Sequence, residues 1–193
     1  MNPARGTAFF ETAIGLCAVA WGRGGIVGVH LPAADGAATR ARVARKHPEA
    51  EETLAPPGVQ LAIDDMVRLL AGERIDLSRI ALDMDDVPEF HRRVYVVART
   101  IPPGATMTYG EVAAHLGEPG SSRAVGRALA QNPFAIVVPC HRVLAADGRP
   151  GGFSAAGGIS TKLRLLTIER ARIGGAPTLF DDAGGLPLAV ATR

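Results

Sequence analysis

Two apolar runs joined by a four-residue turn place the strongest constraint on the fold. Residues 14–21 and 26–31 are rich in Val, Ile, Leu and Ala, and three of the four residues between them, 22–25, are glycines. Apolar runs that flank such a turn are typical of a β-hairpin, because glycine adopts the positive φ angles that tight turns require. The sequence therefore predicts a small antiparallel sheet in the first half of the chain.

Helical patterns follow the hairpin. Segment 39–46 is predicted to be a short charged helix that ends before Pro48, and segment 59–71 places apolar side chains at the spacing of an amphipathic helix. Residues 75–82 have the composition of a third strand, and the acidic stretch 83–87 has that of a linker. We expect these elements to form an α/β N-terminal domain over residues 1–87.

The second half of the chain is predicted to be mainly helical. Thr108 is a candidate N-cap, as are Ser121 and Ser122, and the glycine-rich stretch 117–120 forms a turn between two of the helices. The predicted helices are 88–100, 109–116 and 123–131. Helix, glycine turn and helix in this order indicate a (winged) helix-turn-helix, so we expect a mainly helical C-terminal domain over 88–175.

Composition narrows the classes of protein and site. Hydrophobic residues make up 47% of the 193-residue chain, yet no run of about 18 apolar residues occurs, so we expect no membrane contact. The two cysteines, Cys17 and Cys140, lie too far apart for a disulfide framework, which favours the cytoplasm. His30 and His47 are scattered around Cys17, so we expect no metal site.

Charge is unevenly distributed along the chain. Residues 1–87 carry 9 Lys and Arg against 12 Asp and Glu, whereas residues 88–175 carry 11 against 5. A basic domain suits contact with the phosphates of nucleic acid. A solvated basic surface without a partner explains the same numbers.

A cysteine beside a histidine is the candidate reactive centre. Cys140 follows the apolar run 135–138, predicted as a short buried strand, and precedes His141 and Arg142. Cysteine reacts as the thiolate, which a neighbouring base and a nearby cation favour. His141 and Arg142 are candidates for these two parts. A lone cysteine after an apolar run is more often an inert core residue, so the pair alone does not establish a site.

Five short motifs resemble the O6-alkylguanine-DNA alkyltransferase family in order and spacing. They are YGEVA at 109–113, RAVG at 123–126, NP at 132–133, IVVPCHRV at 136–143 and GGFS at 151–154. The resemblance implies direct-reversal DNA repair. An alkyl group, chiefly methyl, passes from O6 of a guanine flipped out of duplex DNA to Cys140. The thioether is not hydrolysed, so such a methylated-DNA–protein-cysteine S-methyltransferase acts once.

The same resemblance implies roles for individual residues, and no cofactor. His141 accepts the thiol proton through a water, Glu169 orients His141, and Asn132 ties the helix-turn-helix to the segment that holds Cys140. Arg123 fills the gap that the flipped base leaves. The further implied contacts with guanine or DNA are those of Tyr109, Ala124, Arg127, the Val143 carbonyl and Ser154.

Rival functions come from other classes. A non-catalytic sensor of alkylated bases needs no reactive thiol, and Cys140 argues against it. A helix-turn-helix regulator would carry an extra cysteine-zinc domain, which we do not expect, and a thiol hydrolase needs an independent oxyanion motif. We expect a monomer. The tail, 176–193, is predicted to be flexible, and its segment 177–180 resembles the Leu-Phe peptides that bind the sliding clamp, which predicts a weak contact of that kind.

Overall fold

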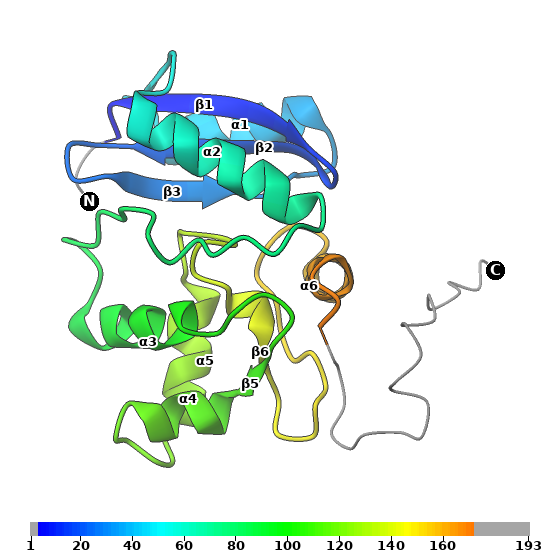
Figure 1. The fold of residues 1–193 in the computed structure, drawn as a ribbon. Coiled ribbons are helices and arrows are strands. Elements are labelled where there is room, and N and C mark those ends of the chain that lie inside the picture. Colours follow the sequence, from blue (N-terminus) through cyan, green and yellow to red (C-terminus); the bar gives the residue numbers. More distant parts are fainter. Residues whose placement is uncertain (1–3, 172–193) are drawn as a thin grey trace.

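The computed structural model describes residues 4–171 of the chain. In this part, Figure 1 shows a four-stranded sheet with two helices, a group of three further helices, and a last helix beside both. None of the described helices is long and apolar enough to span a membrane. The tail and its predicted clamp contact lie outside the described residues, so both stay predictions.

The sheet contains the predicted hairpin. β2 (Gly15–Trp21) pairs antiparallel with β3 (Ile26–His30) and, on its other side, with β1 (Gly6–Thr12). The prediction of an antiparallel sheet is wrong at one edge, because β4 (Glu51–Glu52) pairs parallel with β1 and makes the sheet mixed. The chain passes through a helix before it reaches β4, so β4 runs in the direction of β1.

The two helices of this half cover opposite faces of the sheet (Figure 1). α1 (Gly36–Lys46) contacts β2, and α2 (Pro57–Leu70) contacts β1. α1 begins at Asp35, whose carboxylate accepts a hydrogen bond from the Ala38 amide at 2.7 Å. Both predicted helices are confirmed, with boundaries that differ by up to three residues.

The predicted strand at 75–82 is wrong. Its contact with the sheet is limited to an isolated bridge between Leu82 and Ile26 of β3, in which the Ile26 amide donates to the Ala81 carbonyl at 3.0 Å. Three other carbonyls of this segment bind Arg99, whose guanidinium donates to the carbonyls of Leu77 at 3.3 Å, of Ile80 at 2.7 Å, and of Ser78. A long arginine side chain thus satisfies carbonyls that strand pairing would otherwise occupy.

The predicted helices of the second half are confirmed as α3 (Glu89–Arg99), α4 (Tyr109–His115) and α5 (Ser122–Ala130). Thr108 caps α4 in a reciprocal capping box with Glu111. Ser121 precedes α5, but its side chain makes no capping bond, because its backbone has φ −82° and ψ 15° rather than the extended conformation of a capping residue. Gly117 in the intervening turn has φ 75°.

The chain between α5 and the last helix carries Cys140. The predicted strand at 135–138 is wrong, because Ala135 and Val138 bridge each other across a turn in which Ile136 has φ 62°. A single 3₁₀ turn (Cys140–Arg142) follows, and then β6 (Val143–Leu144), which pairs parallel with β5 (Met107–Thr108). α6 (Gly158–Ile168) packs against this 3₁₀ turn.

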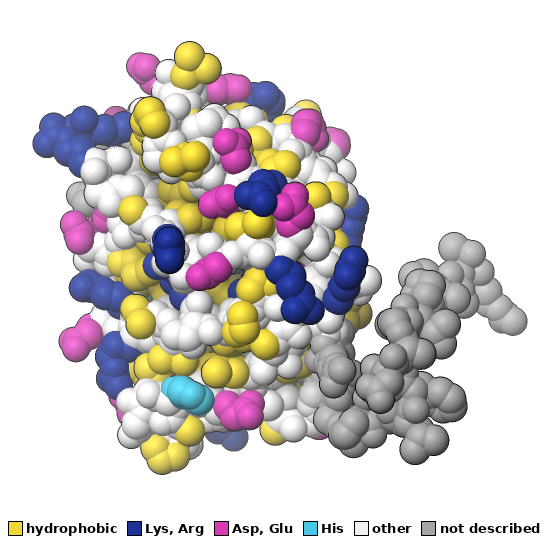
Figure 2. Space-filling view, in the orientation of Figure 1, with side chains coloured by type: hydrophobic (Ala, Val, Ile, Leu, Met, Phe, Trp, Pro, Cys, Tyr) yellow, Lys and Arg dark blue, Asp and Glu magenta, His cyan; other side chains and the backbone are white. Residues whose placement is uncertain are grey.

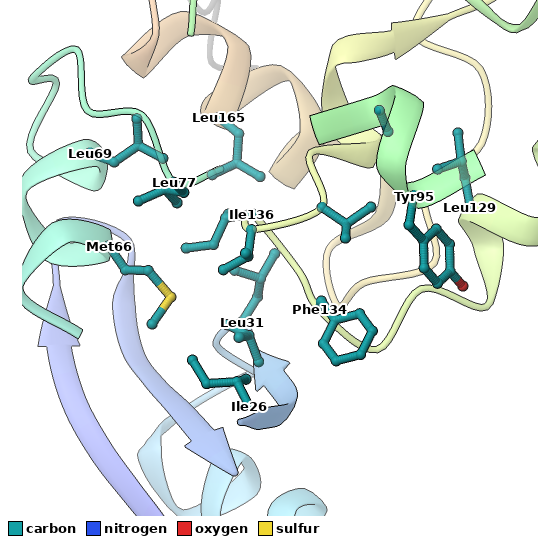
Figure 3. Close-up of a cluster of buried hydrophobic side chains, with 14 of the residues drawn as sticks. Ile26, Leu31, Met66, Leu69, Leu77, Tyr95, Leu129, Phe134, Ile136 and Leu165 are labelled. Atoms are coloured by element: carbon teal, nitrogen blue, oxygen red, sulfur yellow. The ribbon is translucent and has the colours of Figure 1, made fainter. Parts of the chain in front are cut away.

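One hydrophobic core extends through both halves. Figure 3 shows Leu31 and Met66 from the sheet half beside Phe134 and Ile136 from the second half, and all four belong to a single buried cluster. The backbone connects the halves as well, since the Val29 amide of β3 donates to the Pro133 carbonyl at 2.8 Å. The division into two domains at residue 87 stays a prediction.

Candidate active site

Cys140 lies at the start of the 3₁₀ turn and is half-buried. Its backbone follows the buried turn 135–138 and leads into β6, so the chain on both sides of it is fixed by core packing. The second cysteine, Cys17, is fully buried in β2, where burial raises the pKa of its thiol to about 11. Cys140 is therefore the thiol with access to a substrate.

His141 is completely buried and bound to Glu169. Its Nε2 lies 3.0 Å from Oε1 of Glu169, and Glu169 is itself buried at the end of α6. An ionised carboxylate only accepts hydrogen bonds, so Nε2 carries the proton and Nδ1 has the free lone pair. Among the described residues Nδ1 has no hydrogen-bond partner. The orientation leaves one buried basic nitrogen available.

Arg142 holds the carboxylate in place. Its Nε and Nη2 donate to the two oxygens of Glu169 at 2.8 and 2.7 Å, and its Nη1 donates to the Ile101 carbonyl at 2.6 Å. Burial opposes ionisation of Glu169, but the hydrogen bonds from His141 and Arg142 outweigh it and lower the pKa of that carboxyl to about 2. The carboxylate is thus charged throughout the neutral range.

Two opposite effects act on the pKa of the Cys140 thiol. Burial raises the pKa of the Cys140 thiol, whereas the Asn132 side chain, the Lys162 charge and the amides of the 3₁₀ turn favour the thiolate. Burial also lowers the pKa of His141, so its imidazole is neutral at pH 7 and able to accept a proton. The sequence suggested Arg142 as the cation beside the thiol, but its guanidinium binds Glu169. The positive charge that acts on the Cys140 thiol is that of Lys162.

Asn132 spans the turn that precedes Cys140. Its side-chain amide donates to the Val138 carbonyl at 2.8 Å and its oxygen accepts from the Phe134 amide at 2.9 Å. Asn132 directly follows α5, whose C-cap is Gln131. One side chain therefore connects the end of α5 with the residue two positions before Cys140.

Tyr109, the first residue of α4, is half-buried beside the same site. A Cβ built on Gly151 would lie 3.4 Å from the Tyr109 hydroxyl oxygen, and one on Gly126 of α5 would lie 3.8 Å from its ring. The Nζ of Lys162 lies 5.9 Å from the ring centroid, at the outer range of a cation–π contact. The ring is therefore held between α5, the loop at 151 and α6.

The remaining predicted residues lie on α5, in the loop before α6 and in β6. Arg123 and Arg127 are exposed one helical turn apart on α5, and Ala124 between them is half-buried. Ser154 is exposed in the loop between β6 and α6 and, in the described part of the chain, makes no hydrogen bond to the other site residues. Val143 is buried, and its carbonyl accepts a hydrogen bond from Lys162 at 2.6 Å.

Lys162 is the site residue that the motifs do not indicate. It precedes Glu169 by seven residues, or about two helical turns, so both point from α6 toward the segment 140–143. The seven-residue spacing between Lys162 and Glu169 was the one sign of this role in the sequence. A lysine two turns before a functional carboxylate, on an otherwise apolar helix face, is compatible with a shared site.

The three potential metal ligands of the first half do not gather. Nε2 of His30 lies 2.9 Å from Nε2 of His47, whereas the Cys17 sulfur lies 3.6 Å from the Thr12 hydroxyl oxygen. Burial, with the neighbouring positive charges, lowers the pKa of His30 to about 3. Two neutral imidazoles sharing a hydrogen bond account for this pair, and the absence of a metal stays a prediction.

Comparison with known proteins finds matches to one family. Residues 89–171 match the family described as 6-O-methylguanine DNA methyltransferase, DNA binding domain. The methylated-DNA–protein-cysteine methyltransferase of Mycolicibacterium paratuberculosis is 45% identical over 120 residues, which cover 62% of this chain and 70% of that protein.

Solved structures agree over most of the described fold. Mycobacterium tuberculosis OGT in complex with DNA is 33% identical, with a TM-score of 0.68 over 85% of this chain and 92% of that one. The O6-methylguanine-DNA methyltransferase of the archaeon Pyrococcus kodakaraensis is 28% identical, with a TM-score of 0.66 over 84% and 98%. The chain belongs to the methylated-DNA–protein-cysteine methyltransferase family.

Proposed function

We propose that this protein repairs O6-alkylguanine in duplex DNA by moving the alkyl group, chiefly methyl, to Cys140 once per molecule. The observation that carries the proposal is a half-buried thiol whose neighbour His141 is held by Glu169 with a free Nδ1. Membership of the methyltransferase family supports the same reaction. The sensor and the regulator lack such support, because neither needs an oriented base beside a thiol.

In the proposed reaction the base prepares the nucleophile. Nδ1 of His141 takes the thiol proton, through a water, while Glu169 stabilises the imidazolium that forms. The sulfur of Cys140 then attacks the alkyl carbon in line. The S–C bond forms as the C–O6 bond breaks, the electron pair stays with guanine, and guanine takes up the released proton. A thioether has no good leaving group, so the protein is consumed.

The DNA contact is proposed to use α4 and α5 as a helix-turn-helix in a C-terminal domain of residues 88–175. α5 would lie in the minor groove, with Arg123 filling the space of the flipped base and Arg127 near the phosphates. Tyr109 and the carbonyl of Val143 would contact the flipped guanine, and Ser154 would close the pocket. On the face in Figure 2 basic and acidic side chains are interspersed, and the proposed contact rests on the exposed Arg123 and Arg127 of α5.

Incubation with a duplex that contains O6-methylguanine tests the function. We expect the mass of the intact protein to rise by one methyl group and the modification to map to the Cys140 peptide. Cys140→Ala removes the nucleophile but no DNA-binding side chain, so it should gain no methyl and still bind the lesion. A duplex that keeps its methyl group while the wild-type Cys140 peptide stays unmodified would refute the proposal.

Arg123→Ala tests the proposed extrusion of the base. We expect transfer from duplex DNA to slow by about tenfold or more, since flipping a base requires a few kcal/mol. Transfer from the free base O6-benzylguanine should change little, because no stacked base must be displaced. Single-turnover rates on the two substrates measure the difference. Arg127→Ala removes a proposed phosphate contact from the same helix, so it is the control for a loss of DNA affinity alone. Equal slowing of Arg123→Ala on both substrates would contradict the assigned role of Arg123.

A further inference from the structure

Lys162 is a buried cation that the proposed reaction does not yet use. Its side chain is 0% exposed, and within residues 4–171 its Nζ donates one hydrogen bond, to the Val143 carbonyl at 2.6 Å. An ammonium group has three donors, and burial of a charge without a counter-charge is strongly unfavourable. The position therefore calls for a partner of negative charge.

The described carboxylates do not supply that charge. Glu169 is on the same helix, but its two oxygens are occupied by Arg142 and His141. Lys162 is in none of the salt bridges among the described residues. The titratable group that acts on it is Cys140, whose charge favours the ammonium, while burial lowers the pKa of Lys162 to about 8.

The neighbours of Lys162 leave the thiol as its partner. Tyr109 presents its ring face, 5.9 Å from Nζ, and burial with the charge of Cys140 raises the pKa of its phenol, which therefore stays neutral. His141 is neutral at pH 7. Cys140 and Val143 are the first residue of the 3₁₀ turn and the residue after it, so a group bound to the Val143 carbonyl lies beside the turn that carries the sulfur.

We infer that the Lys162 ammonium is the counter-ion of the Cys140 thiolate and at the same time fixes the Val143 carbonyl in the pocket. Lys162 enters and leaves the reaction as an ammonium, and the thiol proton still goes to His141. The inference deepens the proposed function and rests on it only for the identity of the natural substrate. Lys162 is a positioning residue that acts on the nucleophile through its charge.

Lysine is rare in this chain, in which most basic residues are arginines. Only Lys46 and Lys162 are lysines among its 21 Lys and Arg residues. An ammonium is a compact charge with donors in three directions, whereas a guanidinium is a planar fork suited to two parallel acceptors. A site that must bind one carbonyl and face one sulfur fits the former.

Lys162→Met tests the inference, because methionine keeps the length and removes the charge. The rate at which iodoacetamide alkylates the Cys140 peptide is measured by mass spectrometry as a function of pH. We expect alkylation at pH 7 to slow about tenfold or more and the pH midpoint to rise, with the high-pH plateau unchanged. Lys162→Arg keeps the charge and should restore much of the rate at pH 7. A structural role alone would lower the plateau and leave the midpoint in place, which would overturn the inference.

A second measurement does not depend on how Lys162→Met folds. In protein labelled at lysine ¹³Cε, NMR titration should show the pKa of Lys162 falling when Cys140→Ala removes the thiol, with Lys46 as the internal control. An unchanged titration of Lys162 would overturn the inference. If these results hold but no methyl is taken from DNA, the proposed function fails alone. If methyl transfer occurs and the pH midpoint does not move, only the inference fails.

Discussion

Replacing His141 by glutamine is expected to slow methyl transfer to Cys140 by about 10²–10⁴-fold at pH 7. The glutamine amide can still donate to Glu169, but its oxygen is a very weak base, so the variant loses the free lone pair that Nδ1 provides. Single-turnover transfer from an O6-methylguanine duplex measures the effect. The melting temperature and DNA affinity of the variant serve as controls for folding and docking.

The pH profile separates a base from a packing role for His141. Burial lowers the pKa of His141 below its ordinary value of 6.5, so the wild-type rate should fall only as the pH drops through that lowered pKa. The glutamine variant should lack this acid inflection. An inflection that survives the substitution would show that another group accepts the proton.

Arg142→Met is expected to lower the free energy of unfolding by about 3–5 kcal/mol at pH 7, because it leaves the buried Glu169 carboxylate without its main partner. The carbonyl of Ile101 loses a donor as well. Urea denaturation followed by circular dichroism measures the change. Arg149→Met is the matched control, since Arg149 pairs with Asp147 in an exposed loop and its loss should leave the free energy of unfolding nearly unchanged.

The stability difference should depend on pH in a stated direction. Glu169 has a pKa of about 2 in the folded protein against its ordinary value of 4.5, so the stabilisation is present above pH 4.5 and is lost as the pH falls toward 2. The wild type and Arg142→Met should therefore approach one another in acid. A constant gap from pH 7 to pH 3 would mean that Arg142 stabilises the fold through packing rather than through Glu169.

Helices and strands whose apolar residues repeat at a regular spacing could be predicted from the sequence. The β2–β3 hairpin and helices α1 to α5 follow from apolar spacing, turn glycines and the Thr108 cap. β1 gives a weaker signal, since most of its residues are only partly buried and it is held by pairing with β2. Segment 135–138 has the composition of a strand, but its buried residues form a turn, and Ile136 adopts a positive φ that no composition rule indicates.

The candidate site was predictable where short motifs carry it. The contiguous Cys140, His141 and Arg142 identify the reactive turn, and the family resemblance adds Glu169. The sequence does not show that Arg142 binds Glu169 rather than facing the thiol, since that depends on how α6 packs against the 3₁₀ turn. The position of Lys162 beside the 3₁₀ turn depends on the same packing, because Lys162 lies twenty-two residues after Cys140 in the sequence.

The hydrogen bond from the Val29 amide to the Pro133 carbonyl connects the sheet with the segment that leads to Cys140. Pro133 adjoins Asn132, so a rigid strand buttresses the bend from which the sulfur is presented. The sheet half supplies none of the groups in the proposed reaction, and its part is to hold in place the bend that precedes Cys140. The position of the Cys140 sulfur therefore depends in part on the sheet, which lies outside the proposed DNA contact.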